Sequence, residues 1–456
     1  MLRYFTVSNW KSIYEPVEFS MVATQERQHG ERLSRVERSR ILPVAAIYGA
    51  NASGKSVFVD ALGAFQDIVL KARNVDDDLP IVPHLSRGAD EPTKFEIEFS
   101  VDTGSSNGKG REETLIYELR ADKGKVLEES LLRVRPRGEI VLFEREGDLI
   151  ELYEELDGDD VAEALAKTLG IKSNTTFLGE LGDRYASKLQ ENVIVNARRW
   201  FAERLCVIGP RSSAMGLPFR VMADDDFKQA IGELLSWADT GIADVDFEEI
   251  PLRALEIPSR FEERIWKALA SGGEKAVSLG FGDLGVLELD DSGQLKARRL
   301  VAIHRDGNEK QFTLGFDDES DGTNRFLNLL PMLIQLQDTK GDVVFVVDEL
   351  ENSMHPKLTE ALIRSFLGSL STKGESRRQL AFSTHELQLL RSDLLRRDEI
   401  WLADKANTQT QLTRLSDFSK EGVRKDADIL GFYMSGRLGG IPKADSFMGF
   451  KRGKEI

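Results

Sequence analysis

The sequence predicts an α/β protein with a mixed and antiparallel β lobe and a helical insertion. Three observations support this fold class. The apolar run 43–48 leads into a glycine-rich turn and then a helical stretch, which makes a strand–loop–helix unit. Residues 94–152 alternate apolar and polar side chains at a period of two, as antiparallel strands do. The last third of the chain alternates short apolar strands with helices, as a parallel sheet requires.

The glycine-rich turn matches a known phosphate-binding pattern. Residues 49–56 read G-A-N-A-S-G-K-S, which fits G-x-x-x-x-G-K-S, and the helix that begins near Lys55 directs its N–H groups and positive dipole end at the turn. Lys55 would reach the β- and γ-phosphates, and the Ser56 hydroxyl would take a Mg²⁺ position. An ordinary Gly/Ser turn is the alternative, and the strand–loop–helix context disfavours it. The residues predicted to bind the nucleotide here are Gly49, Asn51, Ala52, Ser53, Gly54, Lys55 and Ser56.

Composition and charge restrict the remaining classes. The chain has 456 residues, 41% hydrophobic and 30% charged, which suits a globular protein of two or three domains. Its apolar runs are too short to span a bilayer, its start lacks a secretory signal, and its single cysteine, Cys206, excludes an intrachain disulfide. We therefore expect a cytoplasmic protein. The net charge of −16 argues against a surface that coats nucleic acid, so nucleic-acid contact through a local basic patch is allowed but not indicated.

The chain divides into three predicted regions. Residues 1–155 form an N-terminal lobe with the loop and the antiparallel strands, 156–284 a mainly helical insertion, and 285–456 a C-terminal lobe. Within the insertion, residues 159–206 and 225–238 are predicted to be helical. In the C-terminal lobe, the helix at 324–336 contains Pro331, which should end or kink it.

Two carboxylates follow the most apolar strand. Residues 343–347 are a buried parallel-type strand that ends in Asp348 and Glu349, at the sheet edge where the phosphate loop also lies. Asp348 is placed to hold Mg²⁺ through water, and Glu349 to orient and polarise the attacking water. Alone, this pattern would be a turn with two solvated acids. Its coupling to the phosphate loop favours the catalytic interpretation.

Two further positions complete the candidate site. His385 follows the apolar strand 379–383, where it could contact the γ-phosphate or the water; otherwise it is a surface histidine. Ser320 precedes a helix as a cap, with Gly322 beside it, and such a helix start binds anions. A simple capped helix is the alternative. The position of Ser320 just before the strand that carries the carboxylates favours a functional role.

In this order the motifs resemble the ABC-type ATPase head shared by SMC, RecF-like and OLD-type proteins. They are more similar still to the stand-alone ABC-type ATPases of bacterial phage-defence operons, of the Abi-L and Rlo type. The resemblance covers most of the chain, through the blocks 48–56, 237–245, 319–326, 348–356, 382–386 and 434–442. Asp321 departs from the pattern because transporter-type signatures have glycine there. The usual glutamine loop cannot be placed, and Gln66, inside the first helix, is a poor candidate.

The resemblance implies ATP hydrolysis with Mg²⁺ in a nucleotide sandwich. The phosphate loop, Asp348, Glu349 and His385 of one head would face Ser320 and Gly322 of a second, which gives a homodimer or a higher even homo-oligomer. Residues 352–355 would connect the two sites. No membrane partner is expected.

Three functions compete. The leading one is an ATPase that acts as sensor or regulator of a separately encoded effector, a nuclease or toxin, in bacterial antiviral defence. The second is a RecF-like repair or maintenance ATPase that clamps nucleic acid directly, against which the acidic charge counts. The third is a nucleotide-gated scaffold in which Glu349 is inert. The helical stretch 159–238 is the part least constrained by ATP chemistry, and we expect self-assembly or partner recognition there.

Overall fold

The computed structural model describes residues 1–102, 112–169, 172–188, 192–210, 216–252, 265–267, 269, 276–279, 285–290, 292–338, 341–371, 373–390, 394–421 and 429–435. The chain forms two compact units. Unit 1 comprises Met1–Pro210, Thr339–Leu350 and Leu367–Ile456, and unit 2 comprises Arg211–Asp338 and Glu351–Phe366. The three-region division at residues 155 and 284 stays a prediction. Residues 436–442 of the last family block lie outside the described residues.

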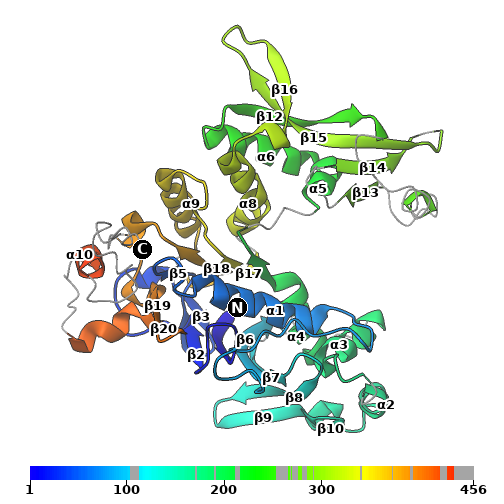
Figure 1. Ribbon diagram of the computed structural model, residues 1–456, viewed down its shortest axis with the longest axis vertical. Coiled ribbons are helices and arrows are strands. Elements are labelled where there is room, and N and C mark those ends of the chain that lie inside the picture. Colours follow the sequence, from blue (N-terminus) through cyan, green and yellow to red (C-terminus); the bar gives the residue numbers. More distant parts are fainter. Residues whose placement is uncertain are drawn as a thin grey trace, which may run out of the picture. The chain divides into compact units, whose positions relative to one another are not determined.

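A six-stranded sheet forms the base of unit 1, in the order β11-β17-β18-β5-β19-β20 (Figure 1). Its pairs are parallel except for the last, in which β20 runs antiparallel to β19. Buried apolar side chains on both faces explain the continuous apolar runs in the sequence. The α/β prediction is confirmed. The strands are β5 (Val44–Tyr48), β11 (Leu205–Ile208), β17 (Asp342–Val347), β18 (Arg377–Thr384), β19 (Ile400–Ala406) and β20 (Gln409–Arg414).

A seven-stranded antiparallel sheet forms the second layer of unit 1, in the order β10-β9-β8-β7-β6-β1-β2. It confirms the antiparallel prediction for residues 94–152. The strands are β1 (Leu2–Ser8), β2 (Val17–Ser20), β6 (Thr93–Asp102), β7 (Glu112–Ala121), β8 (Val126–Arg135), β9 (Gly138–Glu146) and β10 (Leu149–Leu152). A small hairpin, β3 (Ser34–Val36) and β4 (Ser39–Ile41), also belongs to this unit.

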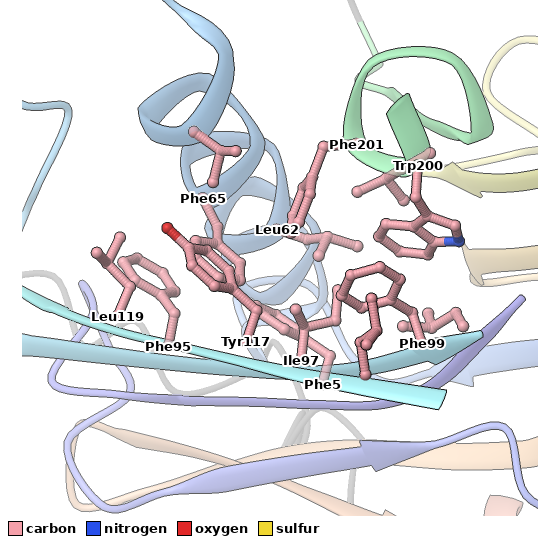
Figure 2. Packing of buried hydrophobic residues seen from close by; sticks show 14 of the residues in the cluster. Phe5, Leu62, Phe65, Phe95, Ile97, Phe99, Tyr117, Leu119, Trp200 and Phe201 are labelled. Atoms are coloured by element: carbon pink, nitrogen blue, oxygen red, sulfur yellow. The ribbon is translucent and has the colours of Figure 1, made fainter. Parts of the chain in front are cut away.

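Aromatic side chains pack helix α1 (Lys55–Leu70) against this sheet (Figure 2). The Phe65 ring stacks on Phe95, with centroids 4.9 Å apart, and on Tyr117 at 5.5 Å. Trp200 stacks on Phe99 at 4.4 Å. Each buried aromatic removes roughly 150–250 Å² from water, so this cluster holds α1 firmly. Because the phosphate loop is the N-terminal end of α1, the core also fixes the loop.

Three helices and a π-helical turn of unit 1 lie directly before a strand that the sequence pattern does not predict. They are α2 (Asp160–Leu169), α3 (Phe177–Ser187), α4 (Val193–Arg199) and a π-helical turn, Trp200–Arg204. The helical prediction for 159–206 is wrong at its end, because Leu205 and Cys206 belong to β11. Four apolar residues carry no period that separates strand from helix. Their pairing with β17, Cys206 opposite Phe345, decides the conformation.

Unit 2 combines a five-stranded sheet with helices (Figure 1). Its strands run in the order β12-β15-β14-β13, and β16 pairs with β15. They are β12 (Ile242–Ile250), β13 (Ala276–Leu279), β14 (Gly285–Leu289), β15 (Leu295–Arg305) and β16 (Gln311–Gly315). Among its described residues are the helices α5 (Leu217–Ala223), α6 (Asp225–Trp237) and α8 (Asp321–Gln337), and α9 (Pro356–Gly368) belongs to this unit up to Phe366.

The expected break at Pro331 is wrong in one respect. Helix α8 continues through Pro331 to Gln337, so the proline does not end it. Buried leucines on both sides of the proline anchor the helix, and this packing offsets the lost backbone hydrogen bond. Unit 1 also contains α10 (Ile429–Met434). Across the described residues, no helix has the length and apolar character needed to cross a membrane.

Candidate active site

The phosphate loop joins β5 to α1 and depends on two glycines. Gly54 is the N-cap of α1 and has φ +106°, and a Cβ built there would lie 2.1 Å from Thr410 Oγ1. A Cβ at Gly49 would lie 2.5 Å from the Ala403 carbonyl oxygen. Gly54 is therefore needed both for its positive φ and for the space beside Thr410, whereas Gly49 is needed for the space beside Ala403. The predicted strand–loop–helix geometry is present.

Lys55 folds back over this loop and is 4% exposed. Its Nζ donates to the carbonyl oxygens of Gly49, at 2.7 Å, and Ala50, at 3.1 Å. His385 Nδ1 lies 3.5 Å from the same Nζ. The ammonium group thus donates to backbone carbonyls of the loop, and an anion entering the loop can take over those contacts.

Asp348 and Glu349 follow β17 and share one organising side chain, Ser383. The Ser383 hydroxyl donates to Asp348 Oδ1 at 2.5 Å and accepts the Glu349 N–H at 2.8 Å. Asp348 is 2% exposed, and its own N–H donates to the Ile208 carbonyl. Glu349 has φ +49°, a conformation that costs a non-glycine residue free energy. Ser383 therefore fixes both the direction of Asp348 and the backbone that presents Glu349.

Strand order explains why these residues meet. Strand β18 lies between β17 and β5, with Val347 opposite Phe382 and Thr384 opposite Tyr48. Parallel strands end at the same edge, so the segments after these strands emerge together. The sequence-based expectation that the carboxylates, His385 and the loop share one sheet edge is met by the placement of their strands.

Ser56 and Asp348 line one hollow of about 760 Å³ in unit 1. Its wall includes Lys11 and Asp60, which form an ion pair with 2.5 Å between Nζ and Oδ2, and the chain at Gly209 after β11. The described residues hold no cluster of three or more His, Cys, Asp or Glu side chains able to bind a metal ion. A hydroxyl and one carboxylate are the donor set that Mg²⁺ uses where phosphates and water supply its other ligands. The residues present therefore fit Mg²⁺.

Thr410 and Ser12 hold the phosphate loop from outside its motif, and no sequence pattern predicts this contact. Thr410 of β20 is fully buried and donates its hydroxyl to the Ser53 carbonyl at 3.1 Å. The Ser12 hydroxyl lies 2.8 Å from Thr410 Oγ1, and the Thr410 N–H donates to the Ser12 carbonyl at 2.7 Å. These residues come from opposite ends of the chain, so no local pattern links them to the loop. Ser383 had a weak signal, as a polar residue at the end of an apolar strand.

Gln66 has a structural role within unit 1. Its Nε2 donates to the carbonyls of Phe201 at 2.6 Å and Leu205 at 2.7 Å. These bonds hold the π-helical turn where it passes into β11. The side chain is therefore engaged inside the fold.

Ser320 and Gly322 lie in unit 2, whereas the phosphate loop, the carboxylates and His385 lie in unit 1. Ser320 is exposed and caps α8, with its hydroxyl accepting the Thr323 N–H at 3.1 Å. A Cβ at Gly322 would lie 2.5 Å from the carbonyl oxygen of Ser353, which has φ +59°. Within unit 2, the start of α8 thus packs directly on the segment that follows Asp348 and Glu349 in sequence.

The parallel sheet, the glycine loop at its edge and the strand-end carboxylates define a P-loop ATPase. More narrowly, the chain belongs to the family described as "AAA domain, putative AbiEii toxin, Type IV TA system", whose sequence profile matches residues 44–391. No curated protein matches the chain.

Two solved structures of the recombination mediator protein RecF are similar. The one described as RecF-ATPrS shares 11% identity, covering 90% of this chain and 98% of its own, with a TM-score of 0.33. The one described as RecF-ATP shares 12% identity, covering 90% and 97%, with a TM-score of 0.35.

Proposed function

We propose that this P-loop ATPase hydrolyses ATP in a composite site built by two copies of the chain, and that it serves as sensor or regulator of a separate effector in bacterial antiviral defence. The observation that carries the catalytic part is the Ser383 hydroxyl, which joins Asp348 and Glu349 at the sheet edge beside the phosphate loop. A pair of solvated turn acids would need no such buried hydroxyl.

Each catalytic residue has a role in this proposal. The N–H groups of Asn51, Ala52, Ser53 and Gly54 face the phosphates, and Lys55 donates to the β- and γ-phosphates in place of the loop carbonyls. Ser56 and Asp348 hold Mg²⁺, which neutralises charge on the phosphates when bound. Glu349 accepts a proton from the attacking water, and His385 positions that water or the γ-phosphate.

The second copy supplies the other half of the site. Ser320 and Gly322, at the start of the 17-residue helix α8, offer a hydroxyl and backbone N–H groups to the γ-phosphate held by the partner. ATP then joins two chains, and hydrolysis releases them. The assembly is a homodimer or a higher even homo-oligomer.

The defence role is supported by the family description, which names a toxin of a type IV toxin–antitoxin system. A nuclease or toxin encoded separately is the proposed output of the ATPase. Co-expression with the products of adjacent genes, in the presence and absence of ATP, tests this role. An effector that binds only one nucleotide state supports it, whereas toxicity of the chain alone would make the chain itself the toxin.

The catalytic proposal is tested with two substitutions and a matched control. Lys55→Ala should remove ATP turnover, with a loss of about 100-fold or more, because the phosphate charge loses its only lysine within the loop motif. Glu349→Gln should keep ATP binding and accumulate ATP-joined oligomers. Lys71→Ala, at the exposed end of the same helix, should behave as wild type.

Phosphate release and light-scattering mass, each measured with and without ATP, read out these variants. Full turnover by Lys55→Ala would refute the assignment of the loop. An unchanged mass for Glu349→Gln with ATP would refute the sandwich.

A further inference from the structure

One histidine of unit 2 is bound to the residue that precedes the cap of α8. His304 Nε2 lies 2.6 Å from Glu319 Oε1, and both side chains are largely buried, at 13% and 8% exposed. An ionised carboxylate only accepts, so Nε2 carries the shared hydrogen. The family resemblance assigned no role to either side chain.

The sheet holds His304 from both sides. In the strand register it lies opposite Ile242 of β12 and Phe312 of β16. The Phe312 and His304 rings stack with centroids 5.3 Å apart and planes 18° from parallel. Gly241, in the family block at 237–245, has φ +80°, and a Cβ built there would lie 3.8 Å from His304 Nδ1. The His304 imidazole is thus held in place by the sheet, and Glu319 is hydrogen-bonded to it.

The start of α8 already carries several negative charges, so the position of the Glu319 carboxylate affects phosphate binding there. Asp317, Asp318 and Asp321 flank the same helix start as Glu319. Carboxylates are favoured by the positive end of a helix, where they compete with an incoming phosphate. A free Glu319 side chain would add a further negative charge beside the Ser320 hydroxyl.

We propose that His304 is a positioning residue of the proposed sandwich site: its hydrogen bond keeps the Glu319 carboxylate against the sheet and off the start of α8. The helix end then stays open to the γ-phosphate of the partner copy. This inference rests on the proposed function, because it concerns the half of the proposed site at the start of α8, which must stay free of the Glu319 charge to bind phosphate. His304 itself touches no phosphate.

The test is a double-mutant cycle in the full-length Glu349→Gln chain, which should hold ATP without turnover. His304→Ala should weaken ATP-driven association about tenfold, because Glu319 is released toward the helix end. Adding Glu319→Gln should restore it, since a neutral amide repels no phosphate. His304→Gln keeps a donor and should lose less than His304→Ala. Sedimentation over a range of ATP concentrations measures association, and binding of a fluorescent ATP analogue to the single chain checks the phosphate loop.

The outcomes separate the two proposals. If the parent Glu349→Gln chain does not assemble with ATP, the sandwich fails and the role of His304 falls with it. If the parent assembles but His304→Ala weakens assembly equally with Glu319 and with Gln at position 319, His304 is merely part of the sheet and only the present inference fails. Equal thermal stability of the His304 variants shows that they fold.

Discussion

The phosphate loop of unit 1 and the start of α8 in unit 2 are both helix N-termini, but they are built in opposite ways. The first has Gly54 as a cap without a side chain, a buried Lys55, and a clamp from Thr410 of a distant strand. The second is capped by its own Ser320, is exposed, and is flanked by acids. The loop has the residues to hold phosphate within one chain, whereas in the proposed sandwich the start of α8 takes a phosphate presented by another chain.

The two helix starts should differ most in how ATP binding responds to a glycine-to-alanine substitution at each of them. Gly54→Ala places a methyl group on Thr410 at a left-handed backbone position, and we expect about 100-fold weaker ATP binding by the single chain. Gly322→Ala displaces the Ser353 carbonyl instead. It should leave that binding unchanged and lower turnover about tenfold. Titration of a fluorescent ATP analogue and phosphate release measure the two effects.

Gly216→Ala is a control in unit 2 with positive φ, where an added Cβ would meet no described atom within 4 Å. It should change neither quantity. Weaker ATP binding by the single Gly322→Ala chain would contradict the proposal that the phosphate loop alone binds ATP and that α8 acts only on the ATP of another chain.

A smaller effect should follow from Ser383→Ala, which tests how unit 1 presents its carboxylates. Without the hydroxyl, Asp348 loses a charge-assisted hydrogen bond and the Glu349 N–H loses its acceptor. Turnover should fall about tenfold with ATP binding little changed. Ser376→Ala, buried just before the other end of the same strand, serves as the control. Equal turnover in the two variants would show that Ser383 has no part in presenting the carboxylates.

The smallest effect concerns stability rather than activity. Glu399, just before β19 in unit 1, is fully buried, and burial raises its pKa to about 8. The folded chain keeps this proton up to about pH 8, whereas the unfolded chain releases it near 4.5. Between these values the folded state binds more protons, so its stability falls as pH rises. Glu399→Gln is neutral throughout and should remove this loss.

Thermal melts at pH 6 and pH 9 measure the effect. The wild-type midpoint should drop by a few degrees more than that of Glu399→Gln between the two values. The exposed Glu375→Gln should follow the wild type. A parallel drop in all three would mean that Glu399 is ionised in the folded chain well below pH 8.

Local sequence patterns were sufficient to predict the elements that have a distinctive composition or period. The loop at Gly49–Ser56, the buried strand before Asp348 and the alternating strands of the antiparallel lobe all lie where their composition and period indicate. The wrong predictions concern segments whose local pattern is weak, or is overruled by tertiary packing. Residues 205–208 became a strand only by pairing with β17, and α8 runs through Pro331 because its leucines are buried on both sides.

The sequence by itself determined the class of chemistry, because a glycine loop that ends in Lys55 and Ser56, and a strand that ends in Asp348 and Glu349, are local patterns with a direct physical meaning. Only the tertiary structure decided which side chains hold that chemistry in place. Thr410 meets Ser53 through packing between segments distant in the chain, and His304 meets Glu319 because β16 pairs back on β15. Such contacts depend on which strands become neighbours, and no local pattern of residues encodes that order.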